Sequence, residues 1–312
     1  MNEHLVLYRA PGGAPVAAPD RCLHRAGMLS KGLVSGGCLE CPYHGWTYGA
    51  KGRLERVPSM GDAAAPGGRA LPVLSALERD GYVYVRFEDG PEELAPFAQP
   101  HWNERGWRRV RLTNRFHNDV TNCAENFIDI PHTSFVHRGI FRSPRRQRLT
   151  ATVTRRGGSV VTRYRGETSN LGPFSRFLNP SGGEISHTDS FHMPNVTCVE
   201  YDFGPRRRFV ITSQSVPEDD KTTLVHTDLA FDYGLWNLVA GPIVRWQGQK
   251  VIDQDLAILA DQAEVLRRTP GEFSHSPADA IHVLIESVRR ELEAGRDPRQ
   301  LPERVQEIEF WV

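Results

Sequence analysis

The chain has 312 residues, of which 39% are hydrophobic and 24% are charged, and equal numbers of basic and acidic side chains give it a formal net charge of zero. This composition is typical of an ordinary globular protein and gives no indication of nucleic-acid binding. No apolar segment approaches the roughly 18–20 residues of a membrane-spanning helix, and residues 1–4 lack the pattern of a secretory signal, so we expect a cytoplasmic protein.

The first hundred residues predict a small all-β unit, because short runs of strand-forming residues alternate there with glycine and proline. The clearest run is 81–87, which is rich in valine and aromatic residues. Proline-rich residues 91–100 predict a linker, so we expect a domain boundary near residue 105. The predicted strands cover residues 4–9, 15–18, 70–74 and 81–87.

Two cysteines and two histidines lie within this unit in a regular arrangement. One residue separates Cys22 from His24, sixteen residues follow, and two residues separate Cys41 from His44. Two thiolates and two imidazoles can hold a [2Fe-2S] cluster of the Rieske type, in which the imidazoles replace two cysteines on one iron and raise the reduction potential. The same donors also suit tetrahedral zinc, which is the alternative at this point.

The residues around these ligands favour the cluster. Residues 21–25 and 41–49 resemble the two ligand loops of Rieske proteins, with Leu23 at a position that is usually proline. Their glycines allow backbone amides to approach the sulfurs, and their aromatic rings keep solvent away. The remaining cysteines, Cys38, Cys123 and Cys198, are expected to be reduced thiols that pack in the fold.

A second group of metal-binding residue types lies beyond the linker, in residues 125–137. His132 and His137 could supply two of the three ligands of a mononuclear non-haem iron(II), which two histidines and one carboxylate hold on one face. Residues five apart diverge by about 140° on a regular helix, so the helix must break or bulge between them if they share a metal. In isolation, the same two histidines would also fit the surface of a helix.

Both motifs, in this order and over nearly the whole length, resemble the oxygenase (α) component of the Rieske non-haem iron oxygenases. The step of three residues from Asn126 to Asp129 is similar to the monooxygenase and demethylase branch. The resemblance implies an α+β protein, with an all-β Rieske [2Fe-2S] domain over residues 1–105. A helix-grip catalytic domain with a curved antiparallel sheet would follow over residues 106–312. The implied cofactors are a [2Fe-2S] Rieske cluster on Cys22, His24, Cys41 and His44, and a mononuclear Fe2+ on His132, His137 and one carboxylate.

The resemblance also implies that Asp129 connects the iron site of one subunit to the Rieske site of its neighbour. A carboxylate can accept an N–H from an imidazole on each side, and His44 and His132 are the candidate donors. Such a bridge implies a head-to-tail homotrimer that brings the two centres together. The alternative is that Asp129 caps the helix that begins near Pro131.

The third iron ligand is expected on a late helix, where the resemblance implies an acidic residue followed by glutamine. Residues 251–262 fit this pattern, and Asp255 is the predicted ligand. Asp253 would project about 200° around the helix from Asp255, so only one of the two can face the iron. Asp261 is expected to be solvated.

Runs with period-two hydrophobicity lie between the two groups of iron ligands and predict one curved antiparallel sheet with helices at its side. Substrate is expected between this sheet and the iron-binding helices. The predicted strands cover residues 149–154, 159–165, 196–203, 207–216 and 222–231. The candidate lining residues, each equally compatible with an ordinary core, are Phe191, His192, Asn195, Tyr201, Phe231 and Trp236.

Residues 138–166 contain nine arginines and no acidic residue. This run could dock an acidic electron-donor protein, or it could form a solvated face or a subunit interface. The chain has no glycine motif for a dinucleotide and no ferredoxin-type cysteine cluster, so electrons from NAD(P)H would require a separate reductase, with or without a ferredoxin.

The implied activity is that of an oxygenase that uses O2 to hydroxylate or oxidatively demethylate a small organic substrate. Two alternatives stay open at this point. One is a dioxygenase that cis-dihydroxylates a ring, and the other is a Rieske electron carrier without oxygenase activity.

Overall fold

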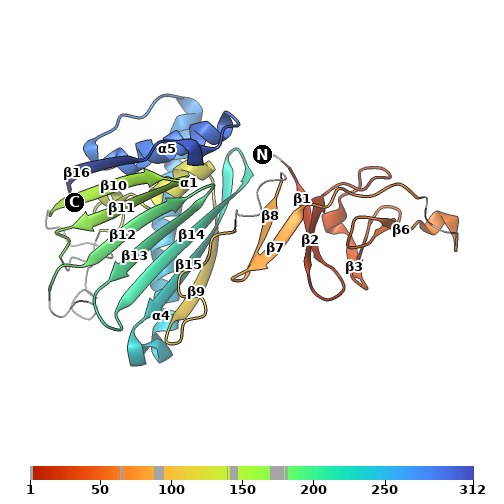
Figure 1. Cartoon of the computed structure of the whole chain (residues 1–312), viewed down its shortest axis with the longest axis horizontal. Helices are drawn as coiled ribbons and strands as arrows, with labels where there is room; N and C mark the ends of the chain where they lie inside the picture. The colour runs from red at the N-terminus through yellow and green to blue at the C-terminus, as the bar shows by residue number, and fades with distance from the viewer. Residues whose placement is uncertain are drawn as a thin grey trace. The chain divides into compact units, whose positions relative to one another are not determined.

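The computed structural model of the chain describes residues 3–63, 65, 67–87, 95–138, 140, 147–168, 179 and 182–312. The chain divides into two compact units, Met1–Ala98 and Gln99–Val312 (Figure 1). This division falls shortly before the boundary expected near residue 105.

The first unit is built almost entirely from short strands. Its elements are β1 (Leu5–Arg9), β2 (Pro15–Pro19), η1 (Leu29–Lys31), β3 (Leu33–Ser35), β4 (Cys38–Glu40), β5 (Thr47–Tyr48), β6 (Leu54–Arg56), η2 (Pro58–Met60), β7 (Ser75–Arg79) and β8 (Tyr82–Arg86). Strands β3 to β6 form an antiparallel sheet in sequence order, while β1 pairs with β2 and β7 with β8. A core that includes Leu29, Leu39 and Tyr48 lies beneath the ligand loops.

One strand expected in this unit is wrong. Residues 70–74 form no strand, and only isolated bridges involve Ala70 and Leu74. The strand begins at Ser75 instead and pairs with β8. The runs expected at 4–9, 15–18 and 81–87 correspond to β1, β2 and β8.

The second unit is built on one antiparallel sheet of eight strands in the order β16-β10-β11-β12-β13-β14-β15-β9. The strands are β9 (Arg108–Phe116), β10 (Arg148–Arg156), β11 (Ser159–Arg165), β12 (Ser186–His192), β13 (Val196–Asp202), β14 (Arg208–Asp219), β15 (Thr222–Asp232) and β16 (Arg304–Trp311). Sequential strands from β10 to β15 are neighbours, and β16 and β9 form the two edges. The expected antiparallel sheet with helices at its side is confirmed.

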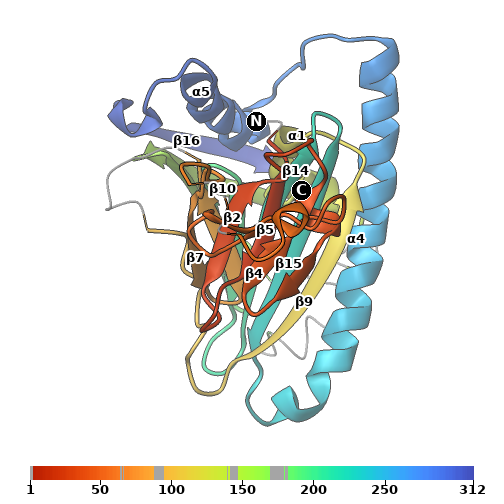
Figure 2. The ribbon, with the colours of Figure 1, turned by 90° about the vertical axis from the view of Figure 1, so that its right-hand side faces the viewer.

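Helices pack against this sheet (Figures 1 and 2). They are α1 (Val120–Asn126), α2 (Ile130–Thr133), α4 (Asn237–Arg268) and α5 (Ala280–Glu293), with the short 3-10 turns η4 (Gly234–Trp236), η5 (Pro277–Asp279) and η6 (Pro298–Gln300). The long helix α4 runs along β9 and β15, and α5 packs on β10 and β11. Gly248 permits the approach of α4, because a Cβ there would lie 2.4 Å from a methyl carbon of Leu229 on β15. Within the described residues, no helix is both long enough and apolar enough to cross a membrane.

Candidate metal centres

The four predicted cluster ligands lie on two loops of the same shape. In each loop the cysteine N–H donates to a carbonyl five residues later, from Cys22 to Gly27 and from Cys41 to Trp46. Each cysteine carbonyl also accepts an N–H from four residues later, and that residue has a positive φ, +53° at Ala26 and +68° at Gly45. The tight turns bring the two cysteines and the two histidines of the motif together.

The sulfur side of this site is buried and the imidazole side is exposed. Cys22 and Cys41 are only 3% and 2% exposed, whereas His24 and His44 are exposed, with ring centroids 4.6 Å apart. Trp46 stacks on His24 with the two rings nearly parallel. An electron could therefore enter or leave most easily through the histidines.

Several local contacts fit a [2Fe-2S] cluster. Burial raises the pKa of the Cys41 thiol, backbone N–H groups of Tyr43 and His44 lower it, and the neighbouring Cys22 raises it further. Amide hydrogens directed at a sulfur stabilise the thiolate that a cluster requires. A Cβ at Gly27 would lie 3.0 Å from the Cys41 sulfur, so a larger residue there would press on this proposed ligand.

Sequence reasoning did not identify Tyr48 as part of this site. Its hydroxyl lies 3.1 Å from the Cys22 sulfur and accepts the N–H of Leu23, and its side chain is fully buried. It therefore holds the first ligand loop against the second. The position of Tyr48 within the Rieske-like segment 41–49 could have indicated this role.

The second candidate centre lies where the first helices of the larger unit end. Asp119 caps α1 by accepting the N–H groups of Thr121 and Asn122. The next helix, α2, carries His132 in its last turn and ends at Thr133, so His137 lies in the following turn. The expected break between the two histidines is present.

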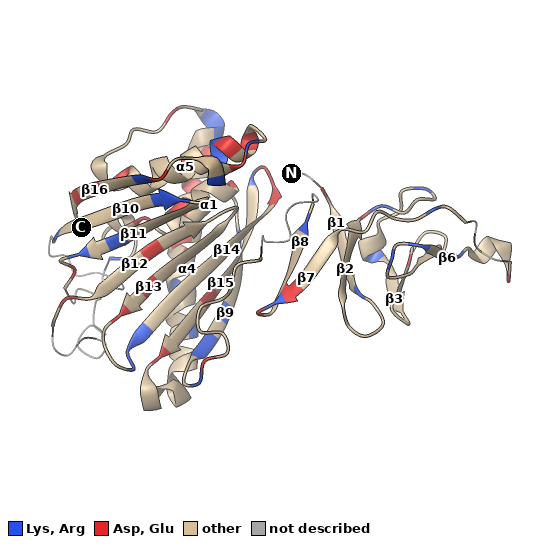
Figure 3. Ribbon diagram, in the orientation of Figure 1, with Lys and Arg blue, Asp and Glu red and all other residues tan. Residues whose placement is uncertain are grey.

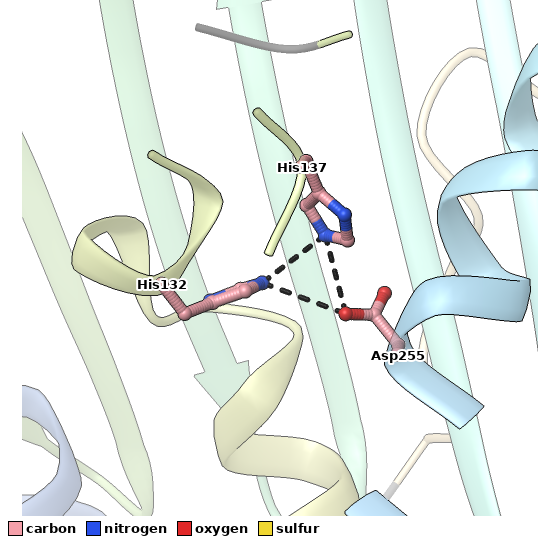
Figure 4. Close-up of side chains that lie close together, drawn as sticks. All are labelled: His132, His137 and Asp255. Carbon is pink, nitrogen blue, oxygen red and sulfur yellow. Dashed lines mark hydrogen bonds and ion pairs between the residues drawn. The ribbon is translucent and has the colours of Figure 1, made fainter. Parts of the chain in front are cut away.

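Three ligand atoms meet at this point (Figure 4). Nε2 of His132 lies 3.3 Å from Nε2 of His137, and these atoms lie 3.6 and 3.2 Å from Oδ1 of Asp255 on α4. Ligands on one face of an octahedral metal, with bonds of about 2.1 Å, are about 3 Å apart. The triangle therefore fits a metal held by two histidines and one carboxylate. Oδ1 of Asp255 is buried and has no other hydrogen-bond partner among the described residues, as expected of a ligand atom.

Hydrogen bonds and charge around the triangle orient its members. Gln254 Oε1 lies 3.0 Å from Nδ1 of His137, and Oδ2 of Asp129 lies 3.3 Å from Nδ1 of His132. Burial lowers the pKa of His132, but Asp129 and Asp255 outweigh it and raise the pKa to about 9. Burial raises the pKa of Asp255, but His132 and His137 outweigh it and hold the pKa below its ordinary value. The imidazolium of His132 and the carboxylate of Asp255 therefore stabilise each other's charged form.

The alternative assignments fare differently. Asp253 and Asp261 are exposed on α4, and Asp253 accepts a hydrogen bond from Gln249. Asp129 occupies the position before α2, yet its side chain makes no capping hydrogen bond and is 42% exposed. Sequence reasoning missed Gln254, although it precedes Asp255 in the segment that was singled out.

A cavity of about 410 Å³ opens beside the triangle and is lined mainly by apolar side chains of the sheet and of α4. His132, His137 and Asp255 all line it, as do Tyr201 and Trp236, two of the six candidate lining residues. The other four candidates, Phe191, His192, Asn195 and Phe231, are not among its described lining residues. The polar residues His187 and Asp189 of β12 also line the cavity, and sequence reasoning missed both.

Comparisons with known proteins agree with this geometry. Residues 1–73 match the family model of the Rieske [2Fe-2S] domain, and residues 116–294 match that of the vanillate O-demethylase oxygenase C-terminal domain. Methylxanthine N1-demethylase NdmA of Pseudomonas putida is 30% identical over 162 residues, which cover 46% of this chain and 41% of that protein. The oxygenase component of dicamba O-demethylase from Stenotrophomonas maltophilia is 29% identical over 274 residues, covering 83% and 80%.

The fold is also similar to solved structures. That of NdmA with caffeine superposes with a TM-score of 0.80 at 23% identity and covers 98% of this chain and 88% of that one. Among the curated relatives, the chain spans less than half the length of NdmA but most of the dicamba enzyme.

Proposed function

The chain belongs to the Rieske non-haem iron oxygenases with a catalytic domain of the vanillate O-demethylase type, and we propose that it is the oxygenase component of a multicomponent system. It hydroxylates or oxidatively demethylates a small organic substrate with O2 and with electrons from a separate NAD(P)H-dependent reductase. The observation that carries this proposal is the triangle of His132, His137 and Asp255 at the wall of a mainly apolar cavity.

Each part of the two sites has a role in this activity. Cys22, His24, Cys41 and His44 would hold the [2Fe-2S] cluster, which would supply single electrons. His132, His137 and Asp255, which line the cavity, would hold the iron, and this iron would serve to activate O2. Gln254 accepts the Nδ1–H of His137, which directs Nε2 of that ring to the metal. The apolar lining excludes water from the reacting groups.

Electron transfer is proposed to cross between subunits through Asp129. This carboxylate is close to the His132 ring on one side and exposed on the other, and His44 is exposed on the cluster loop. A head-to-tail homotrimer would place His44 of one subunit against Asp129 of the next. The exposure of both residues in the single chain supports this arrangement.

The electron donor is proposed to be the reductase itself or a ferredoxin. Within the arginine-rich run, Arg148 and Arg165 pair with Glu309 and Glu307 of β16, so these two are less available for docking. Figure 3 shows how basic and acidic positions are distributed along the ribbon. Three of the nine arginines, Arg142, Arg145 and Arg146, lie outside the described residues. All five cysteines are free, which supports the cytoplasm as the proposed compartment.

The catalytic domain also separates the main proposal from the electron-carrier alternative. A pure carrier requires no second metal centre, whereas this chain combines a three-ligand group with a cavity beside it. Ring dihydroxylation stays a second candidate, because the same iron ligands serve it.

Metal analysis and EPR of protein purified without oxygen test the proposal. We expect about three irons per chain, two of them in a Rieske cluster with its characteristic spectrum. With a reductase and a suitable substrate, O2 consumption should be coupled to product formation. One zinc per chain and no visible absorption would exclude the proposed function.

A further inference from the structure

A buried ionic cluster forms part of the cavity wall on the side of the sheet. His187 lies between two carboxylates, with Nδ1 2.6 Å from Oε2 of Glu167 and Nε2 2.9 Å from Oδ1 of Asp189. All three side chains are at most 2% exposed. His187 and Asp189 project from one face of β12, and both line the cavity that holds the iron ligands.

Two tyrosines hold this cluster in position. The hydroxyl of Tyr164 on β11 donates to Oδ2 of Asp189 over 2.9 Å, and the ring of Tyr201 on β13 stacks on His187 at 4.1 Å. An ionised carboxylate has about four acceptor positions. Within the described residues, Tyr164 and His187 occupy one position on each oxygen of Asp189. Acceptor capacity is therefore left at the cavity wall.

The cluster offers hydrogen-bond acceptors to the cavity. Burial lowers the pKa of His187, but Asp189 and Glu167 outweigh burial and raise it to about 9, so the imidazole is protonated at neutral pH. Both ring nitrogens of His187 and the hydroxyl of Tyr164 donate within the cluster, so the cluster itself offers acceptors and not donors to a ligand. No lysine or arginine is among the described residues that line the cavity.

A structural role alone explains the cluster poorly. Burying charged groups in an apolar region is costly, and apolar residues of similar volume often give equal or greater stability. In contrast, a hydrogen-bond acceptor at a fixed place in a mainly apolar cavity is a usual way in which a binding site orients a ligand.

We propose that His187 and Asp189 form the polar anchor of the substrate, and that this anchor selects neutral or cationic molecules with an N–H or O–H donor over carboxylates. The proposal rests on the proposed function, because the cavity must be the one that holds substrate. The donor binds at β12, and the apolar body of the molecule lies between the sheet and α4. A carboxylate has no hydrogen to donate to Asp189, and its negative charge would lie beside the Asp189 carboxylate, where little water screens it.

Three molecules of nearly equal shape test the anchor: 4-methoxybenzylamine, 4-methoxybenzyl alcohol and 4-methoxybenzoate. They share a methoxyarene and differ in carrying a cation, a neutral donor or an anion. Calorimetric titration of the iron-loaded enzyme, without O2 or reductant, gives their dissociation constants. We expect the amine and the alcohol to bind at least about tenfold more tightly than the benzoate, which corresponds to about 1.4 kcal/mol.

Variants show which residues cause the difference in affinity between the amine and the benzoate. Asp189→Asn is expected to reduce the ratio between amine and benzoate to less than about threefold, and Glu167→Gln to reduce it in the same direction. Asp202→Asn removes an exposed carboxylate from the neighbouring strand β13 and should leave the ratio unchanged.

The wild-type enzyme alone can overturn the proposal, even if a variant fails to fold. Benzoate binding as tight as amine binding, or no binding of the amine, would do so. An unchanged ratio in a folded Asp189→Asn variant would do so as well. The titration requires no turnover, so an enzyme that selects the amine but consumes no O2 contradicts the proposed oxygenase function and leaves the anchor intact.

Discussion

Nε2 of His137 lies 3.2 Å from Oδ1 of Asp255, a contact that joins the turn after α2 to the middle of α4. The two histidines come from one short segment, so the third proposed ligand, Asp255, together with Gln254 beside it, ties the site to the long helix. The site is complete only when α4 is docked on the sheet.

Replacing this carboxylate should therefore remove the mononuclear iron and leave the cluster in place. For Asp255→Asn we expect iron content to fall from about three to about two per chain, with turnover reduced at least about 100-fold. Metal analysis measures the iron content, the visible spectrum shows whether the cluster is retained, and product formation measures turnover. Asp253→Asn, at an exposed position of the same helix, should behave like the wild type. A third iron retained in Asp255→Asn contradicts the assignment.

Asp129→Asn should separate metal binding from electron transfer. The change preserves shape and removes the charge beside His132, so we expect near-normal iron content and turnover reduced at least about 100-fold. Stopped-flow reoxidation of the reduced cluster, in the presence of substrate and O2, should slow correspondingly. The matched control is Asp261→Asn, which alters an exposed carboxylate on α4. Normal turnover in Asp129→Asn would rule out the bridge.

Gln254 should increase the affinity for iron by orienting the ring of His137. Gln254→Leu removes the acceptor that lies 3.0 Å from Nδ1, and we expect iron affinity to fall about 10- to 100-fold. Competition with a chelator at graded concentrations measures this loss. Gln249→Leu, one helical turn or so earlier and outside the triangle, is the control. Equal affinities in the two variants would show that the hydrogen bond does not support the metal.

Exchanging alanine and glycine in the two cluster loops should change their stability in opposite directions. Ala26 has a φ of +53°, which is unfavourable for any residue with a Cβ, so Ala26→Gly should stabilise the loop by up to about 1 kcal/mol. Gly45→Ala should destabilise it, because the new Cβ would lie 2.8 Å from Cγ of Pro58. The denaturant concentration at which the cluster absorbance is lost gives both signs. A less stable Ala26→Gly variant contradicts the argument.

The ionic cluster on β12 should make stability depend on pH. The pKa of His187 is about 9 in the folded chain and near 6.5 when unfolded, so the folded state binds more protons between these values. The stabilisation is fully present below pH 6.5 and is lost as pH rises through about 9, with an upper limit of about 3 kcal/mol. Urea denaturation across this range should show the decline. Asp189→Asn should flatten it, and Asp202→Asn should not; a stability that rises with pH in this window would contradict the assignment.

The metal-ligand candidates were accessible from the sequence because their information is local. Cys22 and His24, Cys41 and His44, and His132 and His137 each lie within a few residues of one another, so spacing alone limits what they can bind. The break between His132 and His137 followed from helix geometry and is present. Asp255 required the family pattern, because no local rule connects it to residues on another element.

The elements that were missed depend on pairing across the chain. Strands β9 and β16 form the edges of the sheet, and charged or polar residues separate most of their apolar positions, so neither contains a long apolar run. The run at 70–74 is extended but has no partner strand along its length. The cluster of Glu167, His187 and Asp189 arises because β11 and β12 are paired in a register that places Tyr164 opposite His187. No spacing in the sequence encodes that register.

The helix α4 forms part of the cavity wall and also carries Asp255, the proposed third iron ligand. Ala240, Val244, Gln247, Val251 and Asp255 recur every three or four residues, so they share one face, and all five line the cavity. A helix is stiff along its axis, so a shift of this face of α4 would also shift the Asp255 carboxylate. The cavity wall and the proposed metal ligand are thus parts of one rigid element. Changes made to broaden the cavity along α4 would alter the timing of oxygen activation together with the choice of substrate.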